Sequence, residues 1–285
     1  MRQRSDPAWL ESQYNNRARV PDHAQHFERW AAASQLARAK GPAHIDIVYG
    51  EDVGETLDVF PAATPGAPVL MFIHGGYWRS LDKADFSFIA PALNAAGATV
   101  VLPNYALCPA VGIEHIALQM TRAVAWVCHH AAAYGADASR LGVVGHSAGG
   151  HLATMLLSCR WKDVDDDLPT QPLAGALSIS GLYDLEPLRH VPSLKADLQL
   201  TPAAVKRLSP AFFPRPKGGK LFATVGLAES DEFLRQNALI RDVWGPTAVP
   251  VCETLPGADH FSVVEGLADP RGRLHALALR LVGLR

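Results

Sequence analysis

The sequence has few cysteines, and they form no recognisable pattern. The four of them, Cys108, Cys128, Cys159 and Cys252, show no CxxC spacing, so neither a zinc site nor a disulfide framework is predicted. A protein without such cross-links suits a reducing compartment, and we expect a cytoplasmic location. No constellation of metal ligands is apparent either, so we expect neither a metal nor a cofactor.

Long hydrophobic runs and an excess of charge are also absent. No apolar run approaches the roughly 18 residues of a membrane-spanning helix, and no apolar segment follows the charged N-terminus Met1–Pro7 as in a signal peptide. Basic and acidic residues number 26 and 28, giving a formal net charge of −2. This balance predicts neither nucleic-acid binding nor membrane binding. A small-molecule substrate is the expected partner, and a homodimer is left open.

The composition is that of an ordinary globular protein, 48% hydrophobic and 19% charged. A chain of 285 residues suits one large domain over 1–285, with a core that needs no cross-links. Residues 1–40 are polar with helical spacing around Phe27 and Trp30, which predicts an N-terminal helical arm interrupted at Pro21. The proline-rich stretch 185–217 leaves room for a short cap, and the acidic stretch 161–172 is predicted to be a solvated loop.

Apolar runs alternate with amphipathic stretches from residue 67 onward. The runs cover 69–73, 99–102, 141–144, 174–179, 221–225 and 249–255, and the amphipathic stretches cover about 83–96, 113–134, 148–160, 231–244 and 266–282. Strands without polar alternation are buried on both faces, as in a parallel sheet. The pattern therefore predicts a mostly parallel, doubly wound α/β sheet with helices on both faces. Before it, the alternating runs 45–49 and 56–60 predict an antiparallel edge hairpin.

A nucleophile motif follows the strand predicted over 141–144. The segment Gly145–Gly149, Gly-His-Ser-Ala-Gly, matches G-x-S-x-G, and the predicted helix over 148–160 follows at once. In this context the serine stands on a strained turn, and the flanking glycines avoid collisions with neighbouring backbone. The helix N-terminus directs N–H groups toward any oxyanion formed there. A glycine-rich turn without catalysis is the alternative, but we interpret Ser147 as the nucleophile.

A second glycine motif, His74-Gly75-Gly76-Tyr77-Trp78, follows the strand predicted over 69–73. An HGG loop at this place carries oxyanion-hole donors in the α/β-hydrolase fold, although a plain Gly-Gly turn is the alternative. We expect the N–H groups of Gly75, Gly76 and Ala148 to bind the oxyanion. Because both motifs occur in this order, each at the carboxyl end of a strand, they predict the α/β-hydrolase fold.

Position along the chain selects a general base among the 12 histidines. In this fold the base follows the last strand, and His260 follows the run 249–255. His74 is instead assigned to stabilising the HGG loop, and His151 to helix packing.

The acid that orients His260 is expected after the strand predicted over 221–225. Glu229 and Asp231 both follow it, and spacing alone does not separate them. Asp231 is equally suited to the first turn of the next helix. Asp184, after the preceding strand, is a third candidate that a turn or cap explains better.

Over nearly its whole length the sequence resembles the arylformamidases (kynurenine formamidases) within the α/β-hydrolases. The matching segments are Tyr14–Arg17 and Val20–Asp22 in the arm, HGGYW at 74–78, GHSAGGH at 145–151, Ser180–Leu188, Glu229–Gln236 and Gly257–Phe261. General esterases do not share the segment around Asp184 at that length. The resemblance implies that the acid is Glu229, where the family more often has aspartate, and that Asp184 is structural.

The resemblance also implies a reaction, the hydrolysis of N-formylkynurenine, an aryl formamide, to kynurenine and formate. Ser147, deprotonated by His260, would attack the formyl carbon and form an acyl-enzyme. Tyr77 and Trp78 would supply an aromatic wall for the arylamine, unless they are core residues beneath the loop. No cation for the substrate carboxylate is identified, and Arg79 is only the nearest in sequence.

Three rival functions fit parts of the same sequence. A carboxylesterase for small acyl esters uses the same triad, which does not select the leaving group. A catalytically silent binding module would typically have lost the serine, histidine or acid, whereas all three are present. A peptidase would want a larger gating domain than this length provides.

Overall fold

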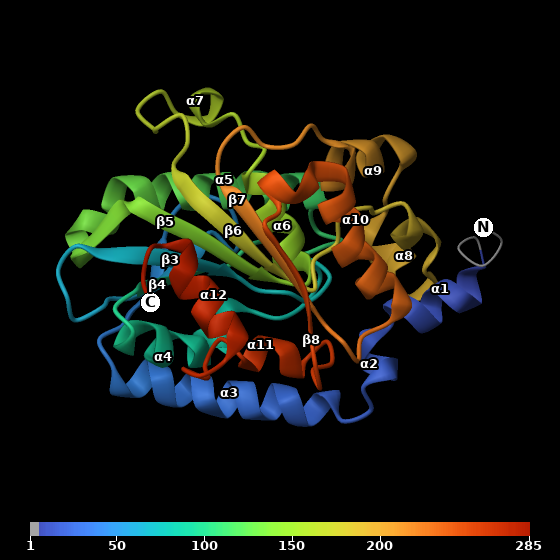
Figure 1. Ribbon diagram of the computed structural model, residues 1–285, viewed down its shortest axis with the longest axis horizontal. Helices are drawn as coiled ribbons and strands as arrows, with labels where there is room; N and C mark the ends of the chain where they lie inside the picture. Colours follow the sequence, from blue (N-terminus) through green and yellow to red (C-terminus); the bar gives the residue numbers. More distant parts are fainter. Residues whose placement is uncertain (1–5) are drawn as a thin grey trace.

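The computed structural model describes residues 6–285, so the N-terminus considered above lies, up to Ser5, outside the described residues. It contains an eight-stranded sheet in the order β1-β2-β4-β3-β5-β6-β7-β8 (Figure 1). The strands are β1 (His44–Val48), β2 (Thr56–Phe60), β3 (Ala67–Ile73), β4 (Thr99–Pro103), β5 (Ala136–His146), β6 (Leu173–Ile179), β7 (Lys220–Gly226) and β8 (Val251–Leu255). Pairings β1–β2 and β2–β4 are antiparallel and all others parallel, which confirms the edge hairpin and the mostly parallel sheet.

Burial on both faces explains the apolar runs. Along β3, Val69, Met71 and Ile73 join the core on one face of the sheet, while Leu70 and Phe72 join the core on the other. Successive side chains of a strand point to opposite faces, so a strand covered on both sides is apolar throughout. The prediction of a doubly wound α/β sheet is therefore confirmed.

Helices cover both faces (Figure 1). On one face lie α3 (His23–Lys40), η2 (Lys83–Ile89), α4 (Ala90–Ala95), α11 (Ser262–Glu265) and α12 (Arg273–Leu281). On the other lie α5 (Ile113–His130), which continues into η3 (Ala131–Tyr134), α6 (Ala148–Leu156) and α10 (Asp231–Ala248). The helix predicted over 266–282 is confirmed as α12 for residues 273–281, but its predicted start is wrong, because residues 266–272, which include Gly266, Pro270 and Gly272, form no helix.

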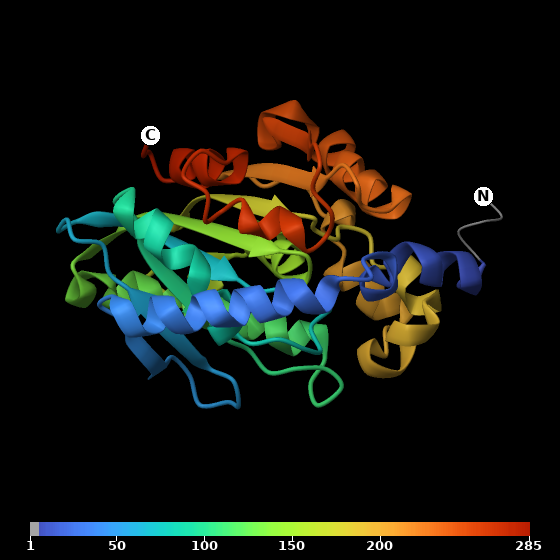
Figure 2. The same ribbon diagram turned by 90° about the horizontal axis from the view of Figure 1, so that it is seen from below.

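The predicted N-terminal arm consists of α1 (Pro7–Tyr14), α2 (Asn16–Arg19) and α3, and it breaks at 20–22 around Pro21. Asp6 caps α1 by accepting the N–H of Ala8, and the Asn15 side chain caps α2 by accepting that of Ala18. Figure 2 shows α3 running along the molecule, while α1 lies beside α8 (Pro192–Leu198).

Helices occur both in the stretch predicted to be a solvated loop and in the stretch predicted to leave room for a short cap. The stretch 161–172 is not simply a solvated loop, since α7 (Trp161–Val164) buries Trp161, and Leu168 is buried as well. The stretch 185–217 holds η4 (Pro187–His190), α8, α9 (Pro202–Leu208) and η5 (Pro210–Phe212). Assigning these elements to a separate cap remains a prediction.

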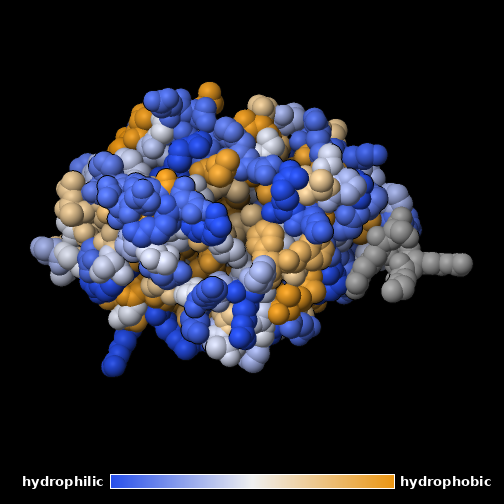
Figure 3. Space-filling view, turned by 90° about the horizontal axis from the view of Figure 1, so that it is seen from above, coloured by the Kyte–Doolittle hydropathy of each residue, from blue (hydrophilic) through white to orange (hydrophobic). Residues whose placement is uncertain are grey.

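The surface agrees with the balanced composition. Hydrophilic residues cover most of the face seen in Figure 3, and hydrophobic residues show there in smaller groups. Across residues 6–285, no helix is both long enough and apolar enough to cross a membrane.

Candidate active site

The turn between β5 and α6 carries Ser147 in a strained conformation. Its φ is 57° and its ψ is −116°, a backbone geometry that residues other than glycine rarely adopt. A Cβ at Gly145 would overlap the backbone of Gly149, and one at Gly149 would overlap the carbonyl oxygen of Ile73. Both glycines are thus needed for the close approach of the turn to the end of β3, as the motif indicates.

Gly149→Ala tests this packing. Because the added methyl group meets backbone atoms on a neighbouring strand, we expect a loss of at least about 1–3 kcal/mol in the free energy of unfolding, the usual cost of overpacking. Thermal and denaturant unfolding measure it. Gly112→Ala is the matched control, since nothing lies within 4 Å of a Cβ there. Equal stability of the two variants would contradict the proposed steric requirement.

Ser147, His260 and Glu229 form one hydrogen-bonded chain. The Ser147 hydroxyl donates to His260 Nε2 over 3.0 Å, and His260 Nδ1 donates to Glu229 Oε2 over 2.7 Å. All three side chains are buried. The arrangement suits proton transfer from the hydroxyl to an imidazole that a carboxylate orients. The structure therefore shows that Glu229, and not Asp231, is the acid that contacts His260.

The other acid candidates lie elsewhere. Asp231 is an exposed first-turn residue of α10, where a carboxylate complements the helix dipole. Asp184 accepts the N–H of Glu186 over 3.1 Å and lies 3.7 Å from Arg235. Its contacts are those of a turn residue.

Three hydrogen bonds fix the Glu229 carboxylate. Besides the contact with His260, Oε1 accepts the Gly226 N–H over 2.8 Å and the Ser180 hydroxyl over 2.5 Å. Ser180 has a φ of 53° and directly follows β6, the neighbour of β7. No role was predicted for Ser180. The sequence feature that could have indicated this contact is a hydroxyl residue at the carboxyl end of the strand next to the one that carries the acid.

His146 positions the loop that holds His260. Its Nε2 donates to the His260 carbonyl oxygen over 2.9 Å, and the two rings lie 5.0 Å apart between centroids. Burial, aided by the nearby His260, holds the pKa of His146 well below its usual 6.5, so the ring is neutral. Sequence reasoning missed this contact, because it depends on two segments 114 residues apart.

The HGG loop lies against the nucleophile. His74 Nε2 donates to Asn104 Oδ1 over 3.0 Å and its ring stacks on Tyr105, which agrees with its predicted role in the loop. A Cβ at Gly75 would stand 3.1 Å from Ser147 Cβ, and Gly76 has a φ of 105° that favours glycine. Ala148 is the first residue of α6. These positions border Ser147, and their role as oxyanion donors stays a prediction.

The two aromatic residues after the glycines, Tyr77 and Trp78, lie in different surroundings. Tyr77 lines the cavity above Ser147, and its hydroxyl donates to the Tyr14 carbonyl over 2.7 Å. Trp78 is 0% exposed and packs edge-on against His151 beneath the loop. The prediction that Trp78 forms a substrate wall is therefore wrong. His151, as expected, serves packing, with Nε2 donating to the Leu208 carbonyl over 2.7 Å.

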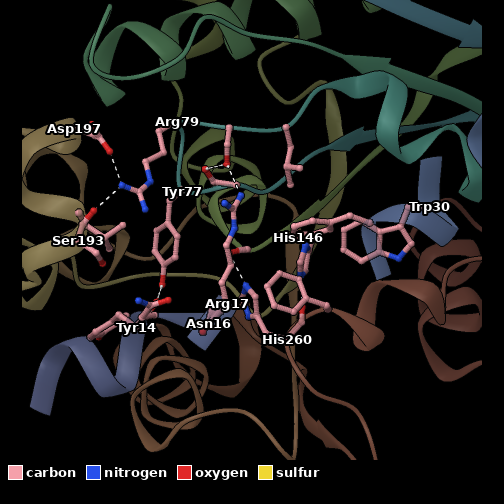
Figure 4. A pocket seen from close by; sticks show the side chains of 18 residues that line it. Tyr14, Asn16, Arg17, Trp30, Tyr77, Arg79, His146, Ser193, Asp197 and His260 are labelled. Atoms are coloured by element: carbon pink, nitrogen blue, oxygen red, sulfur yellow. Dashed lines mark hydrogen bonds and ion pairs between the residues drawn. The ribbon is translucent and has the colours of Figure 1, made fainter. Parts of the chain in front are cut away.

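A cavity of about 310 Å³ opens over Ser147 and His260 (Figure 4). Much of its wall comes from the arm. The arm contributes Tyr14, Asn15, Asn16, Arg17, Phe27 and Trp30, and α8 contributes Ser193, Leu194 and Asp197. None of these side chains was predicted to line the site, because their approach depends on how the arm and α8 pack beside the sheet. The only hint was the resemblance around Tyr14–Arg17.

Metal ligands do not cluster. Within residues 6–285, no group of three or more His, Cys, Asp or Glu side chains is arranged to hold a metal ion. Independence from metals remains a prediction.

Known proteins resemble this chain in sequence and in fold. The BD-FAE family matches residues 57–189. The kynurenine formamidase of Danio rerio is 31% identical, over 90% of this chain and 88% of its own length. A Silicibacter protein whose crystal structure is described as that of a putative thioesterase has a TM-score of 0.81 at 29% identity, covering 94% of this chain and 98% of its own. An esterase from Pyrobaculum calidifontis shares the fold, with a TM-score of 0.70 at 17% identity, covering 90% of this chain and 91% of its own.

Proposed function

The chain belongs to the kynurenine formamidase family of the α/β-hydrolases, and on this premise we propose that it hydrolyses N-formylkynurenine to kynurenine and formate. The observation that carries the proposal is the hydrogen-bonded chain from Ser147 through His260 to Glu229 at the base of the cavity. Hydrolase activity itself follows from membership of the family.

In the first half of the reaction, Ser147 Oγ attacks the formyl carbon while His260 Nε2 takes its proton. The carbonyl oxygen becomes an oxyanion, which the N–H groups of Gly75, Gly76 and Ala148 stabilise. Glu229 stabilises the positive charge that develops on the imidazole. The C–N bond then breaks, and His260 returns its proton to the departing aniline nitrogen, leaving a formyl ester on Ser147.

In the second half, His260 takes a proton from a water molecule, which attacks the formyl ester. Collapse of the second tetrahedral intermediate breaks the bond to Ser147 Oγ, and His260 returns the proton to the serine. Formic acid is released and ionises to formate by giving its remaining proton to water, and the enzyme is regenerated. Every proton exchanged with Ser147, the aniline nitrogen and the attacking water passes through Nε2, which agrees with the fixed contact of Nδ1 to Glu229.

The shape of the cavity supports a small acyl group and an aromatic leaving group. A volume of about 310 Å³ lies at the lower end of the range for small-molecule sites, about 300–1,000 Å³. Aromatic side chains of Phe27, Trp30, Tyr77 and Phe261 border it and suit contact with an aryl ring. The Tyr77 ring is held by its bond to the arm, which limits the space next to Gly76.

Acyl-chain length is the test of this function. Within one leaving-group series, kcat/KM is expected to fall from formyl to acetyl to butyryl, because each added methylene must fit beside the fixed Tyr77 ring. A misfit of this kind costs about 1–3 kcal/mol, or about 10–200-fold. The measurement compares N-formylkynurenine and its acetyl and butyryl analogues with short-chain nitrophenyl esters.

The alternative function, a carboxylesterase, predicts the opposite order of kcat/KM values. A carboxylesterase with a roomy acyl site would hydrolyse butyryl esters faster than formyl compounds. That result would replace the formamidase proposal by an esterase on the same triad.

We also propose a cytoplasmic location, which is supported by the four free cysteines. The suggestion of a homodimer remains a prediction.

A further inference from the structure

The charged groups of the cavity are unequally paired. Two arginines are among the residues that line it, Arg17 and Arg79. Arg79 forms an ion pair with Asp197, itself a lining residue, and donates to the Ser193 carbonyl over 2.6 Å. Its charge is therefore compensated by a carboxylate of α8. Arg79, the cation nearest in sequence to the HGG loop, is thus already paired within the protein.

Arg17 has no such partner. Its guanidinium contacts the Ser80 hydroxyl at 3.5 Å and lies 5.5 Å from the centre of the Phe27 ring, and within residues 6–285 no carboxylate pairs with it. Figure 4 shows its side chain between Tyr77 and His260. Glu229 is already bound to His260, and burial keeps the neighbouring His146 neutral. Arg17 is therefore the uncompensated positive charge of the cavity wall.

Helix α2 contributes a second polar side chain to the cavity. Asn16 is 6% exposed and lines the same cavity, yet within residues 6–285 its Nδ2 has no hydrogen-bond partner. A buried amide left without a partner lowers stability, so such groups usually have a hydrogen-bond partner or bind a ligand. Both residues belong to α2, whose start is fixed by the Asn15 cap. Among the described residues, the cavity thus offers a guanidinium without a carboxylate partner and an amide NH₂ without a hydrogen-bond partner. Such donors are suited to a carboxylate, which accepts several hydrogen bonds.

We propose that Arg17 and Asn16 form the subsite for the α-carboxylate of an amino-acid substrate, with Arg17 supplying the charge and Asn16 an added hydrogen bond. This inference rests on the proposed function, since it identifies the end of N-formylkynurenine remote from the formyl group. The enzyme thereby selects aryl formamides that carry a carboxylate over neutral ones of the same ring structure.

The test compares two substrates that differ only in the carboxylate, N-formylkynurenine and its decarboxylated analogue N-formylkynuramine. In Arg17→Gln, the ratio of their kcat/KM values should fall about tenfold or more, as expected for loss of a charged hydrogen bond. The loss should arise from a higher KM, because the carboxylate keeps its charge throughout the reaction. Arg17→Lys should recover part of the ratio, and Asn16→Ala should lower it less than Arg17→Gln.

Arg19→Gln is the matched control, because it removes the same charge from the same helix, while Arg19 is exposed and does not line this cavity. Its ratio should stay within about twofold of the wild type, since exposed charges beyond contact are screened by salt. An unchanged ratio in Arg17→Gln, or an equal fall in Arg19→Gln, would overturn the subsite.

Failure of the proposed function looks different. If the wild type hydrolysed neither formamide, the function would be wrong, and the subsite would be decided by inhibition of nitrophenyl acetate hydrolysis. Kynurenine should then inhibit more strongly than kynuramine in the wild type, and Arg17→Gln should abolish the difference. Equal inhibition by the two compounds would refute the subsite.

Discussion

Ser147→Ala is expected to lower kcat by about 10⁴–10⁶ while leaving the protein folded, as removal of the nucleophile does in other triads. The Ser147 hydroxyl is the group that donates to His260 Nε2. The variant therefore keeps the base His260 but lacks the oxygen atom that attacks the substrate. The change removes one buried oxygen from a turn whose shape depends on the glycines around it. Stability should therefore change little.

Single-turnover and steady-state rates on N-formylkynurenine measure the loss, with thermal unfolding as the control for folding. Residual activity of a tenth or more in a folded variant would remove Ser147 from the mechanism. Another hydroxyl near His260 would then have to be the nucleophile.

Glu229→Gln is expected to lower kcat by about 10⁴, the effect of replacing the acid in another triad by its amide. An amide is uncharged, and its NH₂ group facing Nδ1 would favour the imidazole tautomer that leaves Nε2 protonated. In that tautomer Nε2 cannot accept the serine proton. The Gly226 N–H and the Ser180 hydroxyl both donate to Oε1, so the amide oxygen is held there and the NH₂ group faces His260.

Asp231→Asn is the matched comparison, one carboxylate-to-amide change two residues away. Asp231 is exposed at the start of α10, so its loss weakens only a helix-dipole contact of about 0.3–1 kcal/mol. We expect near-normal kcat. A larger loss in Asp231→Asn than in Glu229→Gln would mean that Asp231 orients the histidine.

The parts of the fold that the sequence predicted are those that local pattern determines. Strands β3 to β7 are apolar because both faces of the sheet are covered, and this condition is readable from single runs such as 69–73. Ser147 and His260 were found because the fold places the nucleophile and base after particular strands, so their order along the chain was sufficient. Order along the chain did not identify the triad acid, because Glu229 and Asp231 both follow the same strand. Only the structure shows that Glu229 contacts His260.

What the sequence did not predict depends on contacts between distant segments. Trp78 looked like a cavity residue from its neighbours, but the positive φ values of Tyr77 and Trp78 accompany a loop that directs the indole into the core. Ser180 and His146 act on groups 49 and 114 residues away. Arg17 gained its place in the cavity only through docking of the arm, which no periodicity encodes.

The docking of the arm also determines when the site can exist during synthesis. Tyr14 donates to Glu232 over 2.8 Å, a contact between residues 218 positions apart, and His260 lies further along the chain still. The arm is synthesised before the sheet, and its contacts with α10 can form only after α10 has followed. Closing so long a loop is entropically costly and slow, so the cavity is among the last parts to form. Nascent chains that end before α10 contain the Ser147 elbow but cannot hold a substrate over it.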